Sequence, residues 1–191
     1  GLFSLMARTG LHLPCNIESE MGFFSETYAD IGDTQDLAKD LSSFSAHLIK
    51  IIELLEIAQC SNLTDPPSLV LLDEVISSTD PIEGAALAEA ILIRLANLGL
   101  KVVVTTHYNS LKVLAVTNPR FLNASVGFNV NTLTPTYRLM QGIPGGSSAL
   151  IIASRLGMDS NILTQAADLI HQEDQQLSHI FEELQKTKHS L

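Results

Sequence analysis

The pattern of hydrophobic and polar positions changes its period along this chain. Apolar residues recur at helical spacing within 46–58 and within 81–97, whereas 69–72 and 101–106 contain short, unbroken apolar runs. Unbroken runs of this length are typical of strands buried in a parallel sheet, with helices as crossover connections. We therefore expect an α/β fold with a mostly parallel sheet and flanking helices.

Further elements are expected on both sides of this region. Aromatic and β-branched residues favour a strand within 21–31, with a hairpin as one arrangement of it. Two strands near 124–130 and 136–140 form an antiparallel part. Helices are expected at 2–9, at 149–156 and from 160 onward.

Two adjacent acids follow the first apolar run. Asp73 and Glu74 would lie outside the carboxyl end of a parallel strand, where such sheets carry their chemistry. Paired carboxylates are costly there unless a cation or a reaction needs them. In nucleotide hydrolases, an aspartate in this place reaches Mg²⁺, and a glutamate orients and deprotonates the attacking water. The simpler alternative is a buried strand whose acids merely meet solvent.

The second apolar run ends at Thr106 and His107, which we expect beside Asp73 and Glu74. A histidine at a strand end can sense a γ-phosphate through a hydrogen bond. Taken alone, His107 would be an ordinary surface or capping residue. Its position one helical unit after an Asp-Glu strand end favours the phosphate-sensing role.

Two helix starts carry further candidates. Asp80 predicts the N-cap of the helix 81–97. Ser42 and Ser43 precede the helix 46–58. Free backbone N–H groups and hydroxyls at such an end bind anions, phosphates included, although serine is also simply a good N-cap.

Composition narrows the classes of function. The 191 residues, 46% of them hydrophobic, suffice for one domain with a substantial core. The chain has 21 acidic and 11 basic residues and no basic cluster, which argues against a nucleic-acid-binding surface in this segment. No apolar run reaches the roughly 18 residues of a membrane span. Two cysteines without metal spacing fit a reducing compartment, so we expect a soluble, cytoplasmic protein without membrane contact.

Several motifs stand in a characteristic order. They are Asp-Ile-Gly-Asp-Thr-Gln-Asp (30–36), Leu-Ser-Ser-Phe-Ser-Ala-His (41–47), Leu-Val-Leu-Leu-Asp-Glu (69–74), Thr-Asp-Pro-Ile-Glu-Gly-Ala-Ala-Leu-Ala (79–88), Thr-Thr-His-Tyr-Asn-Ser-Leu-Lys (105–112), Pro-Thr-Tyr-Arg-Leu (135–139) and Gly-Ile-Pro-Gly-Gly-Ser-Ser-Ala (142–149). This order resembles the C-terminal ABC-type ATPase domain of the MutS family, from about residue 2 to residue 170. The pieces at 79–84 and 135–139 resemble its second bacterial lineage, the recombination-suppressor or Smr-associated type.

The resemblance implies a P-loop NTPase fold of the ABC type, with ATP and Mg²⁺ as cofactors. It implies Asp73 as the acid on the Mg²⁺ side and Glu74 as the base that orients water. His107 would be the switch histidine near the γ-phosphate.

The resemblance also implies a homodimer. Ser42, followed by Ser43, would open the signature helix and face the nucleotide of the opposite protomer, and Asp80 would lie in the loop that crosses the interface. ATP binding would then favour a closed dimer and hydrolysis would release it. The expected function is a DNA-processing ATPase, acting on mismatched or branched DNA, in recombination control or in ribosome rescue. DNA or the ribosome would be bound by domains outside this chain.

Two features depart from the family pattern. The family's phosphate loop (Walker A) should precede the first helix and is expected upstream of this chain, which alone should hardly hydrolyse ATP. The Gly-rich segment 142–148 cannot take its place, because it lacks the Lys that a phosphate loop requires, and it predicts a tight turn instead. Where the family usually has glycines after Asp-Glu, this chain has Ile76 and Ser78. An isoleucine at positive φ would cost of the order of 1–3 kcal/mol.

These features leave alternatives open. A non-catalytic dimerisation or interaction module is the main one. A different ABC-type ATPase, such as a chromosome-maintenance protein, predicts Leu-Ser-Gly-Gly where this chain has Leu-Ser-Ser-Phe at 41–44, so the MutS form is favoured. The expected organisation is a partial ATPase domain over 1–170 and a helical extension over 171–191, either a frayed end or the start of a coiled coil.

Overall fold

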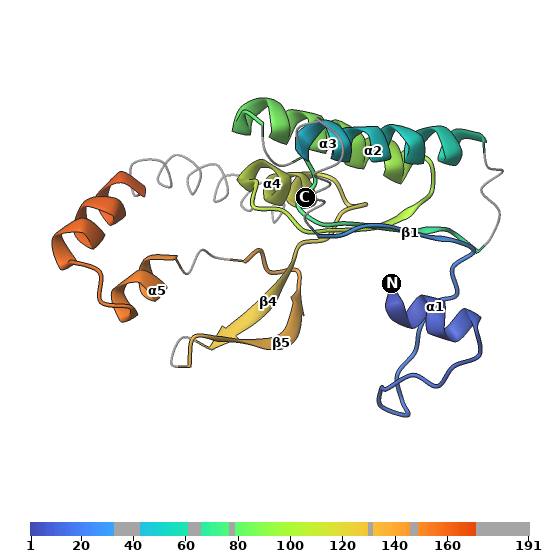
Figure 1. The fold of residues 1–191 in the computed structure, drawn as a ribbon, viewed down its shortest axis with the longest axis horizontal. Coiled ribbons are helices and arrows are strands. Elements are labelled where there is room, and N and C mark those ends of the chain that lie inside the picture. The colour runs from blue at the N-terminus through green and yellow to red at the C-terminus, as the bar shows by residue number, and fades with distance from the viewer. Residues whose placement is uncertain (33–42, 61–65, 77–78, 130–131, 146–148, 171–191) are drawn as a thin grey trace, which may run out of the picture. The chain divides into compact units, whose positions relative to one another are not determined.

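The computed structural model describes residues 1–32, 43–60, 66–76, 79–129, 132–145 and 149–170 (Figure 1). The chain forms two compact units, Gly1–Leu111 and Lys112–Leu191. Ser42, Ser78 and the expected extension at 171–191 lie outside the described residues.

A three-stranded parallel sheet is the centre of the first unit. It pairs β1 (Thr27–Asp30), β2 (Leu69–Leu72) and β3 (Lys101–Val104) in the order β1-β2-β3. The register sets Leu72 opposite both Asp30 and Val104, so all three strands end at the same level. The expected parallel α/β architecture is confirmed.

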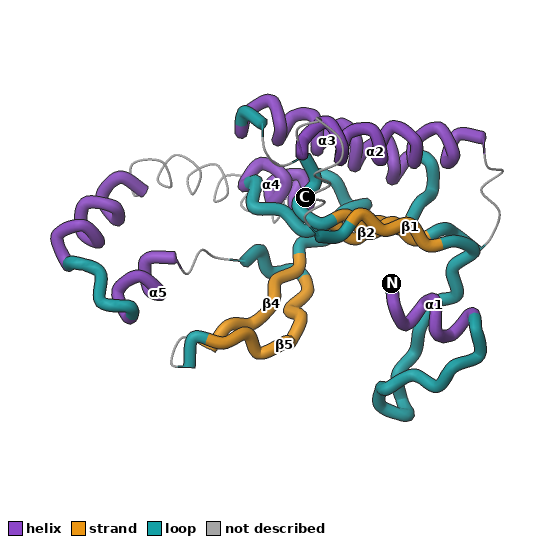
Figure 2. The backbone as a smooth tube through the Cα atoms, in the orientation of Figure 1, coloured by secondary structure: helices purple, strands orange, loops and turns teal. Residues whose placement is uncertain are grey.

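Helices cover the sheet on both faces. The first unit contains α1 (Leu2–Arg8), α2 (Ser43–Cys60) and α3 (Pro81–Asn97). Figure 2 shows α2 and α3 along one face of the sheet and α1 on the other. Val70 and Leu95 are wholly buried, so the core lies between the central strand and the helices above it.

The start of α3 follows directly from its sequence. The Asp80 carboxylate accepts hydrogen bonds from the backbone N–H groups of Ile82, at 2.9 Å, and Glu83, at 3.0 Å. Pro81 occupies the first helical position, where its missing N–H costs nothing. The predicted N-cap is confirmed.

Two expectations about strands were wrong. Within 21–31 only Thr27–Asp30 forms a strand, and it pairs in parallel with β2 instead of forming a hairpin, because α2 carries the chain back across the sheet. In β3, expected to be buried, Lys101 and Val103 are exposed. The exposed positions alternate along β3, so the described helices leave one face of this strand uncovered.

The second unit contains an antiparallel hairpin and short helices. β4 (Ala124–Asn129) pairs with β5 (Thr134–Gln141), which confirms the predicted antiparallel part. α4 (Asn109–Thr117) runs across the boundary between the units, and α5 (Ala149–Arg155) is followed by a helix over 160–170. None of the described helices is long and apolar enough to cross a membrane.

Candidate functional site

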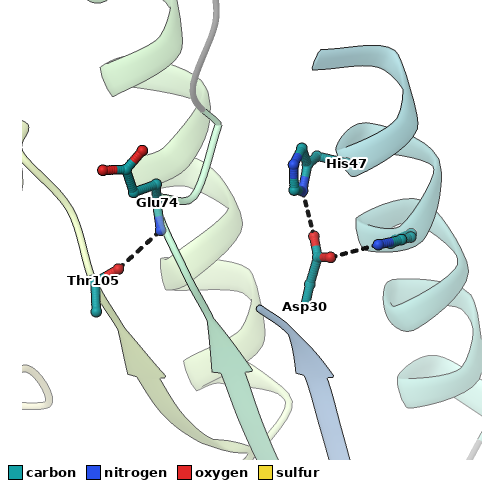
Figure 3. Close-up of polar contacts among 5 residues, drawn as sticks. Asp30, His47, Glu74 and Thr105 are labelled. Carbon is teal, nitrogen blue, oxygen red and sulfur yellow. Dashed lines mark hydrogen bonds and ion pairs between the residues drawn. The ribbon is translucent and has the colours of Figure 1, made fainter. Parts of the chain in front are cut away.

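The ends of the three parallel strands form one row. The Asp73 N–H donates to the carbonyl of Asp30 at 2.9 Å, and the Thr105 N–H donates to the carbonyl of Leu72 at 3.0 Å. The backbone ladder therefore continues one step beyond the strands. Figure 3 shows side chains from this row, with Asp30, Glu74 and Thr105 each at the end of a different strand.

The hydroxyl of Thr105 joins the two acids. It donates to Oδ1 of Asp73 at 2.5 Å and accepts the backbone N–H of Glu74 at 2.9 Å. The first bond fixes the orientation of the Asp73 carboxylate and leaves its Oδ2 without a bond to any described residue. The second holds the backbone of Glu74, which has a φ of 50°. The carboxylate of Glu74 is exposed and points away from Thr105 (Figure 3).

Thr105 lies beside Asp73 and Glu74, where Thr106 and His107 were expected from the sequence. Thr106 bonds to its own segment instead, where its hydroxyl accepts the Tyr108 N–H at 3.0 Å. His107 is exposed, its ring lies 4.7 Å from that of Tyr108, and within the described ranges it makes no hydrogen bond to either acid. The difference is one of register. Leu72 faces Val104, so Asp73 faces Thr105, and this could have been found only by knowing the strand pairing.

Asp73 fits the donor set that Mg²⁺ prefers. The described residues contain no group of three His, Cys, Asp or Glu side chains able to hold a metal ion. At nucleotide sites, however, Mg²⁺ keeps several waters and takes one or two carboxylates together with the phosphates. A single aspartate with one oxygen already oriented by Thr105 is compatible with that arrangement.

The loop after the acids is strained and anchored. Ile76 has a φ of 56°, a conformation that costs a β-branched residue about 1–3 kcal/mol. Its side chain is only 1% exposed, and that of Val75 only 4%. The positive φ expected at the family's glycine position is therefore present with isoleucine in place, and burial of the two apolar side chains offsets its cost.

The remaining predicted residues occupy helix starts. Asp80 uses Oδ1 of its carboxylate to cap α3. Ser43 is the first residue of α2, with only its backbone position described. The structure thus brings Asp73 and Glu74 together, but it gives Ser43 and Asp80 no described contact with them.

An ion-pair cluster at the end of β1 was missed by the sequence analysis. Oδ2 of Asp30 lies 2.6 Å from Nδ1 of His47 (Figure 3). Its Oδ1 lies 2.7 Å from Nζ of Lys50. Burial alone would raise the pKa of the Asp30 carboxyl, but the hydrogen bonds from Lys50 and His47 and their charges outweigh it and lower the pKa. The cluster ties α2 to the strand beside the acids.

A small cavity lies next to this cluster. It has a volume of about 180 Å³, and its lining includes Asp30, Lys50, Leu54 and Leu72. Pockets that enclose small molecules usually measure about 300–1,000 Å³. We therefore place the candidate chemistry at the exposed strand ends and not in this cavity.

Comparisons with known proteins agree on a family. The family model described as MutS domain V matches residues 1–174. The chain is similar to proteins named Endonuclease MutS2, with 46% identity over 190 residues to that of Brevibacillus brevis and 46% over 188 residues to that of Caldicellulosiruptor saccharolyticus. These alignments cover 100% and 98% of this chain but 23% of each relative, so the chain spans less than a quarter of their length.

Replacing Asp30 by asparagine should lower the free energy of unfolding near neutral pH by about 1–3 kcal/mol, because Lys50 and His47 lose a charged acceptor. The lowered pKa of Asp30 means that its contribution is present above the unfolded-state pKa, about 3.9, and is lost as the pH falls through the folded-state value. The difference between the two proteins should therefore shrink below about pH 4. Urea unfolding across this range measures it, with Glu56→Gln on the exposed face of α2 as control. The prediction would be contradicted if the free energies of unfolding of wild type and Asp30→Asn fell in parallel as the pH is lowered below about 4.

Replacing Thr105 by valine should destabilise the first unit by about 1 kcal/mol, because the Glu74 N–H and the Asp73 carboxylate both lose their shared partner. Thr105→Ser is the matched variant, since it keeps the hydroxyl and removes only a methyl group. Urea unfolding and amide exchange at Glu74 measure the two effects. Equal stability and equal exchange in the valine and serine variants would show that the hydroxyl is not what holds the acids.

Proposed function

The chain belongs to the MutS family, and we propose that it is the ATPase domain of a DNA-processing protein, in which ATP binding closes a dimer and hydrolysis opens it. The observation that most supports this proposal is the pair of acids at the end of β2. Thr105 holds the Asp73 carboxylate and the Glu74 backbone, while the Glu74 side chain remains exposed to solvent. This arrangement can position a carboxylate for water activation beside a second carboxylate for a cation.

We assign the chemistry to these two acids. Bound on the Asp73 side, Mg²⁺ would neutralise charge on the phosphates. Asp73 would hold the cation, directly or through water, with the oxygen that Thr105 leaves free, while Thr105 keeps Oδ1 in place. A carboxylate oxygen of Glu74 orients the attacking water and accepts its proton. His107, three residues after the end of β3, donates a hydrogen bond to the γ-phosphate.

The dimer completes the site in this proposal. Ser43, the first residue of α2, and the preceding Ser42 would face the nucleotide bound by the opposite protomer, where the positive end of the helix dipole favours phosphate. Asp80 lies in the interface loop and, as the cap of α3, joins that loop to the helix. Closure is then favoured by nucleotide because each protomer supplies part of the other's site.

In our proposal, the other parts of the ATPase site and the nucleic-acid-binding domains lie outside this chain. The phosphate-binding loop is supplied by upstream residues of a longer protein, so this chain alone binds ATP poorly and is inactive. DNA or the ribosome is contacted by further domains, in the cytoplasm at the nucleoid or at the ribosome. The chain covers only 23% of each of these relatives, which supports the proposal that further domains carry the other functions.

The central test is ATP turnover in the longer protein that includes the upstream segment. Glu74→Gln keeps the size and polarity of the side chain but cannot accept a proton, so turnover should fall by about 100-fold or more while nucleotide binding persists. Glu56→Gln, an exposed glutamate of α2, is the matched control and should leave turnover unchanged. Absence of turnover in the wild type, or turnover unaffected by Glu74→Gln, would refute the assignment.

A non-catalytic interaction module is the second candidate, and one observation favours it. Ile76 holds a strained, buried conformation in the loop after the acids, which suits a rigid contact better than a moving one. An interaction module should dimerise without nucleotide, whereas the ATPase proposal expects this chain to be monomeric without it. Analytical ultracentrifugation of the chain at high concentration, with and without Mg²⁺ and ATP, separates the two.

A further inference from the structure

A tyrosine that none of these roles uses is bonded to the loop after the acids. Tyr108 follows His107 and is 8% exposed. Its hydroxyl donates to the backbone carbonyl of Ile76 at 2.5 Å, and this bond is buried. The segment after β3 is thereby joined to the segment after β2 at a second point, beyond the Thr105 bridge.

A glycine of α3 leaves room for this hydroxyl. A Cβ atom on Gly84 would lie 2.5 Å from the Tyr108 hydroxyl oxygen, 2.9 Å from Cγ2 of Thr79 and 3.3 Å from the Ile76 carbonyl oxygen. Real Cβ atoms essentially never approach other atoms as closely as the first two distances. Glycine is a poor helix former, so the space it leaves is the physical reason for its presence in α3.

The backbone of Ile76 is what aims its carbonyl at the tyrosine. With a φ of 56° this residue is in the left-handed region, which isoleucine rarely adopts without being held. Burial of the Ile76 side chain holds it from one side, and the Tyr108 hydroxyl holds its carbonyl from the other. We call these three residues, Ile76, Gly84 and Tyr108, the tyrosine clamp.

The clamp connects the candidate residues on either side of it. Tyr108 is covalently adjacent to His107, and their rings are 4.7 Å apart. Gly84 donates its N–H to the carbonyl of Asp80 at 2.8 Å. Ile76 lies two residues after Glu74 in the same anchored loop. A displacement of His107 would therefore move the Tyr108 hydroxyl, and with it both the loop after the acids and the start of α3.

We propose that Tyr108 is a positioning residue whose hydroxyl, held against the Ile76 carbonyl in the space left by Gly84, sets the geometry of Glu74 and Asp80 and couples them to His107. The inference rests on the proposed ATPase function for its catalytic part. The clamp itself is a property of the first unit alone. Tyr108 touches no nucleotide in this account, so it affects turnover and not affinity.

The test compares Tyr108→Phe, which removes only the hydroxyl, with Tyr137→Phe, whose ring is 86% exposed in the second unit. In the longer protein, Tyr108→Phe should lower kcat about fivefold, the factor that corresponds to one buried hydrogen bond, and leave KM within about twofold. Tyr137→Phe should change neither. In the present chain, Tyr108→Phe should speed amide exchange at Val75 and Ile76.

A double-mutant cycle with Gly84→Ala makes the test specific. The added methyl group should displace the Tyr108 hydroxyl and lower kcat in the wild type, but it should cost less in the Tyr108→Phe protein, where that hydroxyl is absent. Additive losses, or a Tyr108→Phe protein that is less stable but has unchanged kcat per folded molecule, would overturn the proposal. If the wild type shows no turnover, the ATPase function and the coupling fail together. Unchanged exchange at Ile76 would refute the clamp independently of any activity.

Discussion

Parallel hydrogen bonding between β1, β2 and β3 is the constraint on which the candidate site depends. The ladder aligns Asp30, Leu72 and Val104, the last residues of the three strands, so Asp73 and Thr105, one residue further on, lie at the same end of the sheet as Asp30. Side chains then reinforce this alignment. Thr105 joins the second and third strand ends, and Asp30 joins the first to α2 through His47 and Lys50. Displacing any one strand would separate the acids from the groups that orient them.

The loop after the acids combines strain with anchoring. Glu74 and Ile76 both have positive φ, which L-residues with side chains rarely adopt. The Glu74 N–H donates to the Thr105 hydroxyl, which holds the backbone of Glu74. Ile76 is held by burial of its side chain and by the hydrogen bond from the Tyr108 hydroxyl. Strain of this kind is typical of functional sites, where the surrounding structure fixes a conformation that the local sequence disfavours. The exposed carboxylate of Glu74 is therefore presented from a rigid turn.

Most of the fold was predictable from the sequence, because its elements have strong local signals. The unbroken apolar run at 69–72 correctly indicated the central strand, and Asp80 followed by Pro81 correctly placed the start of α3. β1 was placed within too long a segment and assigned the wrong pairing, since a four-residue strand has little period of its own. Thr105, the Asp30 cluster and Tyr108 were not found, because their roles come from contacts between segments 17 to 32 residues apart. Such contacts depend on strand register, which no single stretch of sequence contains.

The proposed function requires that a nucleotide be hydrolysed at the carboxyl end of β2. A crystal structure of the longer protein with Mg²⁺ and a non-hydrolysable ATP analogue tests this claim directly. We predict the cation on the Oδ2 side of Asp73, the terminal phosphate within reach of a water held by Glu74, and Thr105 still bonded to Oδ1. A nucleotide bound elsewhere, with Asp73 and Glu74 facing only solvent, would contradict the account.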